Sequence, residues 1–227
     1  KRVKLGVDHR IQRTDWLFPV WDVIDLVRGN RIAPEALPAM AERSVAGLLG
    51  LLGQPRASGE ELDGELAEEL RCACEALKKT DDGTKKTADA LRLIKDARDL
   101  LADGELDWCG WAKLAIINPS KRCDAAVVRL REVAGAYERH PRFHADLREL
   151  TSALFEAARI GLTAYAAWKL ERRVVDYVDM LDSALSLIEH PRVKGELATR
   201  LRFTLVDEFQ DTSTIQLALF VKLHAFT

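Results

Sequence analysis

Several features that would place the chain in a familiar class are missing from its 227 residues. No run approaches the roughly 20 apolar residues that a membrane-spanning helix needs, so the sequence predicts no membrane partner. Cysteine is scarce: the four cysteines lie at positions 72, 74, 109 and 123, without the paired spacing of a zinc site. With no signal peptide either, we expect reduced cysteines and a cytoplasmic location.

An excess of one charge is also missing, since 34 Lys and Arg face 36 Asp and Glu. This balance argues against a protein that coats nucleic acid, but it does not exclude a local basic face. Three basic clusters stand out, and a solvated surface is the commoner interpretation of each. They are Lys1, Arg2 and Lys4 with Arg10 and Arg13; Lys121 and Arg122 with Arg129 and Arg131; and Lys169, Arg172 and Arg173. Acids are sparse around the N-terminal cluster, which makes it the first candidate for DNA contact.

A phosphate-binding loop of the form G-x-x-x-x-G-K-[ST] is absent from the chain as well. The nearest approach is "DDGTKKT" at residues 81–87, where Lys78 stands in place of the first glycine. That segment also follows a predicted helix rather than a strand, whereas the loop opens a helix after a strand. The chain alone is therefore expected neither to hold ATP nor to hydrolyse it.

Helical periodicity dominates what is present. Apolar residues three and four apart predict helices over residues 16–28, 34–52, 60–79, 87–101, 106–117, 124–139, 141–171, 174–188, 191–200 and 215–223. Ser213 is the expected N-cap of the last of these helices. Phe203–Val206 is short and β-prone, and it predicts a buried strand whose partner strands would lie outside this chain.

Two other sets of residues admit a functional and a structural interpretation. His140 and His144 are four apart and could form a metal pair, but Pro141 lies between them, and solvated or capping histidines are favoured. Tryptophan side chains could stack on the bases of single-stranded DNA, although a core position is favoured for them. The five tryptophans are Trp16, Trp21, Trp108, Trp111 and Trp168.

Asp207 and Glu208 directly follow the predicted strand. At the carboxyl edge of a sheet, the first acid of such a pair typically holds magnesium and the second polarises an attacking water. A pair of acids after an apolar run is by itself more often a solvated turn, so the pair alone leaves both interpretations open.

A longer string around these acids carries a resemblance. "FTLVDEFQDT" at Phe203–Thr212, with Gln216 four residues on, resembles motif II of superfamily-one DNA helicases of the UvrD/Rep type. "VDYVDML" at Val175–Leu181 resembles the "DFDDL" segment that precedes motif II in these enzymes. The stretch "RVKGELATRLRFTLVDEFQDTSTIQLALF" is similar to the RecB/AddA branch of helicase-nuclease subunits. The likeness is specific over Val174–Leu223 and loose before it.

The resemblance implies a mainly α fold in two parts. Residues 1–175 would be a helical insertion subdomain of the 1B type, and residues 176–227 a strand and helix of an incomplete RecA-like α/β motor domain. The chain would thus be an internal fragment of a longer protein, in keeping with its start at Lys1 rather than Met.

The resemblance also assigns residues and partners. Asp207 would bind magnesium with ATP, Glu208 would be the catalytic base (Walker B), and Gln210 and Asp211 would couple the nucleotide site to DNA. Asp176 and Asp179 are expected to cap or pair within their helix. The parent would be an ATP-dependent DNA helicase in recombination and double-strand break repair, using ATP and Mg2+ on single-stranded and duplex DNA, with a partner nuclease-helicase subunit. Neither cofactor is expected in the isolated chain.

Two alternatives remain open. The chain could be a helical module that binds DNA or protein without catalysis, which the missing phosphate loop favours. The interpretation of the chain as a helical scaffold with an incidental acidic strand end is weaker, because it leaves the ten-residue match to motif II unexplained.

Overall fold

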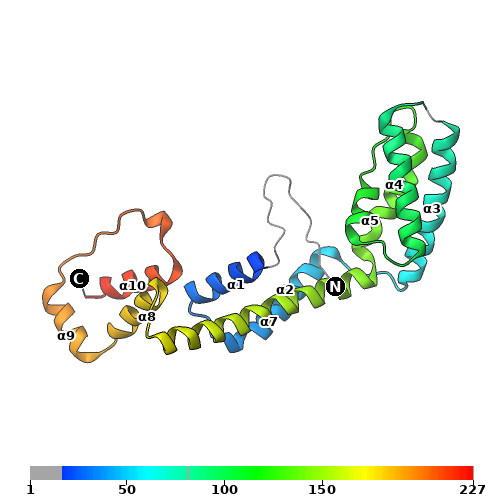
Figure 1. Ribbon diagram of the computed structural model, residues 1–227. Helices are drawn as coiled ribbons and strands as arrows, with labels where there is room; N and C mark the ends of the chain where they lie inside the picture. The colour runs from blue at the N-terminus through cyan, green and yellow to red at the C-terminus, as the bar shows by residue number, and fades with distance from the viewer. Residues whose placement is uncertain (1–16, 81, 227) are drawn as a thin grey trace. The chain divides into compact units, whose positions relative to one another are not determined.

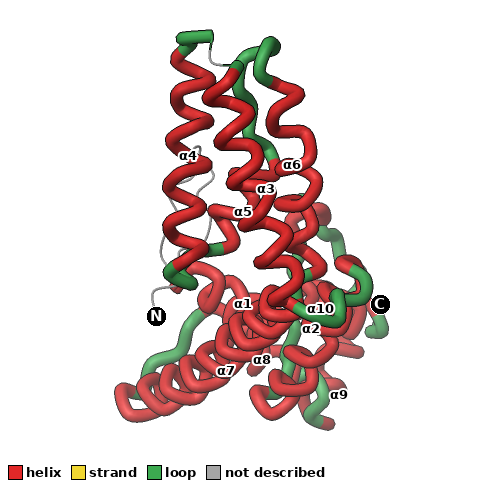
Figure 2. The backbone as a smooth tube through the Cα atoms, turned by 90° about the vertical axis from the view of Figure 1, so that its right-hand side faces the viewer, coloured by secondary structure: helices red, strands yellow, loops and turns green. Residues whose placement is uncertain are grey.

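The computed structural model describes residues 17–80 and 82–226, and within that range it consists of helices and loops without a β-strand (Figures 1 and 2). The chain divides into two compact units. Unit 1 comprises residues 1–42, described from residue 17 on, and residues 152–227; unit 2 comprises residues 43–151. The two boundaries fall inside the helices α2 (Leu37–Leu52) and α7 (Pro141–Arg172).

Unit 2 is a helical bundle built around α3 (Gly59–Lys79). Its other elements are α4 (Lys85–Ala102), α5 (Trp108–Ala115), η2 (Asp124–Val127), α6 (Val128–Gly135) and η3 (Ala136–Arg139). Leucines of α3 at helical spacing, Leu62, Leu66 and Leu70, are fully buried against Ile94 and Trp111. A stripe of this kind buries one face of a helix and leaves the charged residues outside.

Unit 1 contains a second, smaller core where α1 (Leu17–Gly29) packs on the later part of α7. Val20, Ile24 and Val27 of α1 meet Ala158 and Leu162 of α7 there. A Cβ added at Gly161 would lie 3.0 Å from the Cδ1 atom of Ile24, so the glycine leaves room for the approach of the two helices. The remaining elements are η1 (Pro34–Ala36), α8 (Tyr177–Leu187), α9 (Pro191–Arg200), η4 (Phe209–Asp211) and α10 (Thr214–His224).

The predicted helices are confirmed with ends displaced by a few residues, except that residues 124–139 form the short α6 between the 3-10 segments η2 and η3. Ser213 is the N-cap of α10 as expected. The predicted buried strand is wrong for the described chain. Residues 201–206 have no regular secondary structure, and Phe203 and Leu205 are 78% and 87% exposed. A strand needs a neighbour to pair with its backbone groups, and the described residues provide none.

The structure resolves the histidine and tryptophan alternatives residue by residue. His140 and His144 are buried rather than solvated, and the Nδ1 atom of His140 accepts from the backbone N–H of Arg142 at 3.0 Å, which caps α7. Trp111 is fully buried and Trp108 is partly buried, whereas Trp21 and Trp168 are 54% and 45% exposed. Trp16 lies outside the described residues. The four cysteines are free thiols, of which Cys74 and Cys123 are buried. In the described part of the chain, no helix is long and apolar enough to cross a membrane.

Candidate functional site

Asp207–Thr212, the second part of the segment that resembles motif II, lies on the surface of unit 1 between the irregular residues 201–206 and α10. Asp207 and Glu208 are both exposed, and Asp207 accepts from the backbone N–H of Glu208 at 2.9 Å. Glu208 has a φ of 50°, in the left-handed region, and its carboxylate accepts a hydrogen bond from the side-chain amide of Gln210. The expectation that a buried strand holds the two acids is therefore not met, because their carboxylates face solvent.

A capping box at the start of α10 fixes the end of this segment. The Ser213 hydroxyl accepts from the backbone N–H of Gln216 at 3.4 Å, and the side-chain oxygen of Gln216 accepts from the backbone N–H of Ser213 at 2.8 Å. The same Gln216 side chain donates to the hydroxyl of Tyr177 at 2.9 Å. Gln216 thus connects motif II to Tyr177, the first residue of α8.

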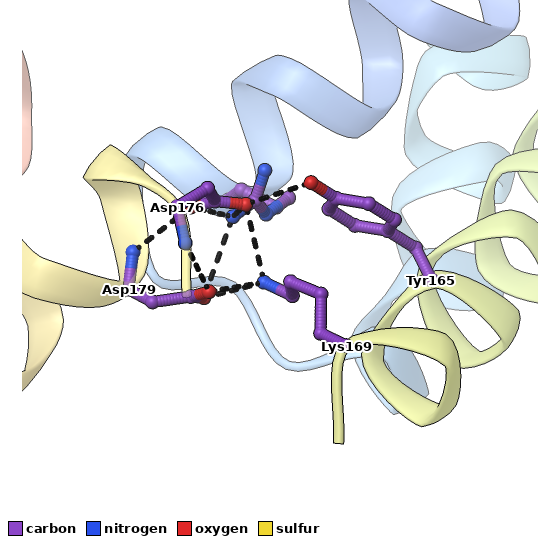
Figure 3. Close-up of polar contacts among 5 residues, drawn as sticks. Tyr165, Lys169, Asp176 and Asp179 are labelled. Carbon is purple, nitrogen blue, oxygen red and sulfur yellow. Dashed lines mark hydrogen bonds and ion pairs between the residues drawn. The ribbon is translucent and has the colours of Figure 1, made fainter. Parts of the chain in front are cut away.

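Five residues form the most connected polar group of unit 1, which we call the α8 ion cluster: Arg28, Tyr165, Lys169, Asp176 and Asp179 (Figure 3). Arg28 of α1 donates to both carboxylate oxygens of Asp176 at 2.6 and 2.5 Å. Lys169 of α7 lies 2.5 Å from both carboxylate oxygens of Asp179 and 3.2 Å from Asp176. The Tyr165 hydroxyl donates to Asp176 at 3.0 Å. Residues of α1, α7 and α8 therefore meet at the two acids, and α1 is distant in sequence from the other two helices.

The two acids of the cluster also begin α8. Asp176 accepts from the backbone N–H of Asp179 at 3.1 Å, and Asp179 accepts from the backbone N–H of Asp176 at 3.0 Å. This capping box confirms that Asp176 and Asp179 cap their helix. No local pattern points to Arg28, which lies 148 positions from Asp176, whereas Tyr165 and Lys169 stand one helical turn apart and form a pair that sequence spacing can indicate.

The electrostatics of the cluster hold both acids ionised. Partial burial alone would raise the pKa of Asp176, but hydrogen bonds from Arg28, from the Asp179 backbone and from Tyr165 outweigh it and lower the pKa well below the usual range. Burial alone would likewise raise the pKa of Asp179. Hydrogen bonds from Lys169 and from the Asp176 backbone outweigh this effect, so the pKa of Asp179 is lowered. Two cations thus balance two carboxylates.

The residues present fit a magnesium–nucleotide complex only in part. Within residues 17–80 and 82–226, no three His, Cys, Asp or Glu side chains gather as a metal site. Magnesium in nucleotide sites commonly takes one or two carboxylates and fills its remaining positions with phosphate oxygens and water. Asp207 could supply one such carboxylate, but the sequence offers no phosphate-binding loop. The residues of this chain alone therefore do not complete a magnesium–nucleotide site.

The other predicted site residues are placed as follows. Gln210 and Asp211 lie in η4 beside the acids and are exposed. The N-terminal basic residues proposed for DNA contact, Lys1, Arg2, Lys4, Arg10 and Arg13, lie outside the described residues.

Comparison with known proteins gives one match. A model of the UvrD/REP helicase N-terminal domain matches residues 67–226. No curated protein and no solved structure matches the chain. The matched range contains the motif II segment, α8 with its two acids and most of unit 2, and it spans well over half of the 227 residues. The chain therefore belongs to the UvrD/REP helicase N-terminal domain family.

Proposed function

We propose that this chain forms part of an ATP-dependent DNA helicase of the RecB/AddA-like branch, active in recombination and double-strand break repair. Membership of a UvrD-like family indicates a DNA helicase that uses ATP and Mg2+. The observation that carries the proposal is the string "FTLVDEFQDT" inside the matched range, because it places two acids in the order that nucleotide hydrolysis requires.

The roles of the residues follow from their chemistry. Asp207 provides a hard oxygen ligand for magnesium, and Glu208 positions and deprotonates the attacking water. Gln210 and Asp211 couple the nucleotide site to DNA. The exposed carboxylates on an irregular segment suit a site that is completed by other parts of a motor, where a neighbouring sheet would order residues 203–206.

The proposal includes the division of labour in the parent protein. Residues 1–175 act as a helical insertion of the 1B type, and residues 176–227 belong to the motor domain. ATP and Mg2+ are held once a phosphate-binding loop is supplied by the parent, so the isolated chain does not hydrolyse ATP. The parent works in the cytoplasm with a partner nuclease-helicase subunit, and the N-terminal basic residues contact DNA.

The decisive test is ATP hydrolysis by the full-length protein that contains this sequence. We expect Glu208→Gln to lower DNA-stimulated turnover by about 100-fold or more while nucleotide binding is retained. Asp207→Ala should weaken the magnesium dependence of nucleotide binding. Asp182→Asn, which alters a half-exposed acid of α8 outside motif II, is the matched control and should leave turnover unchanged. Equal turnover in the wild type and in Glu208→Gln would refute the proposed role.

The finer assignment to the RecB/AddA-like branch needs a separate experiment. We expect the full-length protein to unwind duplex DNA and to co-purify with a partner nuclease-helicase subunit. The alternative of a non-catalytic binding module gains some support from unit 2, which has its own core and contains no part of motif II. A parent protein that binds DNA without any hydrolysis dependent on Glu208 would favour that alternative.

A further inference from the structure

The last turn of α7 carries an aromatic and cationic surface that the helicase motif leaves unexplained. Trp168 is 45% exposed, although a core position was favoured for it. One side of its ring stacks on Tyr165, with ring centroids 6.0 Å apart and planes 15° apart. The guanidinium carbon of Arg172 lies 4.8 Å from the Trp168 ring centroid. We call Trp168, Arg172 and Arg173 the α7 end patch.

Arg173 adds an unusual backbone to this patch. It directly follows α7 with a φ of 53°, a conformation in which glycine is strongly preferred. Arg31 adopts the same conformation after α1, but it forms an ion pair with Asp182 at 2.5 Å. Arg173 is exposed and makes no ion pair with any described residue. The guanidinium of Arg173 is therefore available to an anionic ligand, and its backbone conformation is strained for a residue other than glycine.

Arg173 provides the net positive charge of the α7 end patch, because the other charged side chains around it are paired. Arg172 pairs with Glu171 at 3.0 Å, and the neighbouring Lys169 and Arg28 are balanced by Asp176 and Asp179. No uncompensated acid of the α8 ion cluster therefore opposes an anion. The ligand must combine a flat apolar group that can stack with a modest number of negative charges.

We propose that the α7 end patch binds single-stranded nucleic acid by stacking a base on Trp168. Tyr165 supports the ring from one side, and the incoming base replaces the Arg172 guanidinium on the other. Arg172 and Arg173 then contact the phosphates on either side of that base. This binding subsite rests on the proposed function, in which single-stranded DNA is the substrate.

Base stacking on Trp168 contributes more to binding than the contact with the Arg172 guanidinium that it replaces. A cation over an exposed aromatic ring contributes a factor of about 2 to 5 in an equilibrium constant, whereas a base stacked on an aromatic side chain contributes a factor of about 5 to 150. The displaced guanidinium also gains a phosphate contact, and the free energy of that contact offsets the loss of its contact with the ring.

The test is fluorescence anisotropy of a labelled oligothymidylate titrated with the chain at low and moderate salt. Trp168→Ala should weaken binding by about 5- to 150-fold, and Trp168→Phe should retain most of the affinity. Trp21→Ala is the matched control, because Trp21 is 54% exposed and no cation lies over its ring among the described residues. Circular dichroism melts of all variants should coincide with the wild type, since both tryptophans are largely at the surface.

A second pair of variants tests the phosphate contact independently. Arg173→Gly relieves the left-handed backbone and should lower the slope of log K against log salt by about 0.7. Arg31→Gly makes the same backbone change at a paired residue and should leave the slope unchanged. Equal affinities of Trp168→Ala and Trp21→Ala would overturn the inference while leaving DNA binding elsewhere, and with it the proposed function, intact. Absence of saturable binding by the wild-type chain would also overturn it, whereas the hydrolysis assay of the full-length protein would still decide the proposed function.

Discussion

The α8 ion cluster gives the sharpest prediction about stability. Asp176→Asn removes one negative charge but keeps an oxygen that can cap α8, because asparagine is as good an N-cap as aspartate. Arg28 and Lys169, whose side chains are 17% and 11% exposed, are then left with one carboxylate between them. Hydrogen bonds to charged groups are worth about 1.5–3 kcal/mol, and losing one member of a partly buried pair leaves the other uncompensated. We expect unit 1 to lose about 2 kcal/mol.

Hydrogen exchange is the suitable assay because it separates the two units. Peptides from α8 (Tyr177–Leu187) should exchange about 30-fold faster in Asp176→Asn, as a loss of about 2 kcal/mol implies. Peptides from α3 in unit 2 should be unchanged. Asp182→Asn is the control, because its ion pair with Arg31 has both side chains nearly half exposed and is worth at most about 1 kcal/mol. Equal protection of α8 in the two variants would refute the argument that the cluster holds this helix.

Three further predictions concern pH, the core of unit 2 and the start of α10. Folding lowers the pKa values of Asp176 and Asp179. Their contribution to stability is therefore complete above about pH 5 and is lost as the pH falls through about 4 and below. The midpoint temperature of the thermal melt of unit 1 should accordingly decrease as the pH is lowered across this range. Leu66→Ala removes a fully buried side chain of α3 and should cost unit 2 about 3 kcal/mol in urea unfolding followed by tryptophan fluorescence, and a cost below about 1 kcal/mol would contradict the packing described. Gln216→Ala removes one side of the capping box and the hydrogen bond to Tyr177, and hydrogen exchange should show α10 losing about 1 kcal/mol of protection, with unchanged exchange arguing against this link.

The helices could be predicted because their information is local. Leu62, Leu66 and Leu70 repeat at helical spacing, and the capping residues Ser213 and Asp176 stand directly before their helices. The partners across the fold could not be predicted in this way. Nothing in the sequence near Asp176 points to a residue in α1, since that contact depends on how separate helices pack.

The sequence of motif II indicates the family but not the local structure of the segment. The string around Asp207 and Glu208 was sufficient to suggest the family, which the match over residues 67–226 then established. The β-prone composition of residues 203–206 nevertheless did not produce a strand, because pairing depends on neighbours that composition does not supply. The exposure of Trp168 is not predictable from the sequence for a related reason. Helical spacing shows that aromatic residues share a face, but it does not show whether another element covers that face.

The irregular residues 201–206 have a consequence for handling the protein in solution. A short apolar, β-prone stretch with Phe203 and Leu205 exposed is the kind of window from which intermolecular aggregation starts. The charged residues Arg202 and Asp207 flank this stretch and oppose its aggregation. In parallel strands formed by two copies, each arginine would lie beside another arginine and each aspartate beside another aspartate, and these like charges repel. The solubility of the chain should therefore depend on these flanking charges more than on its nearly neutral total.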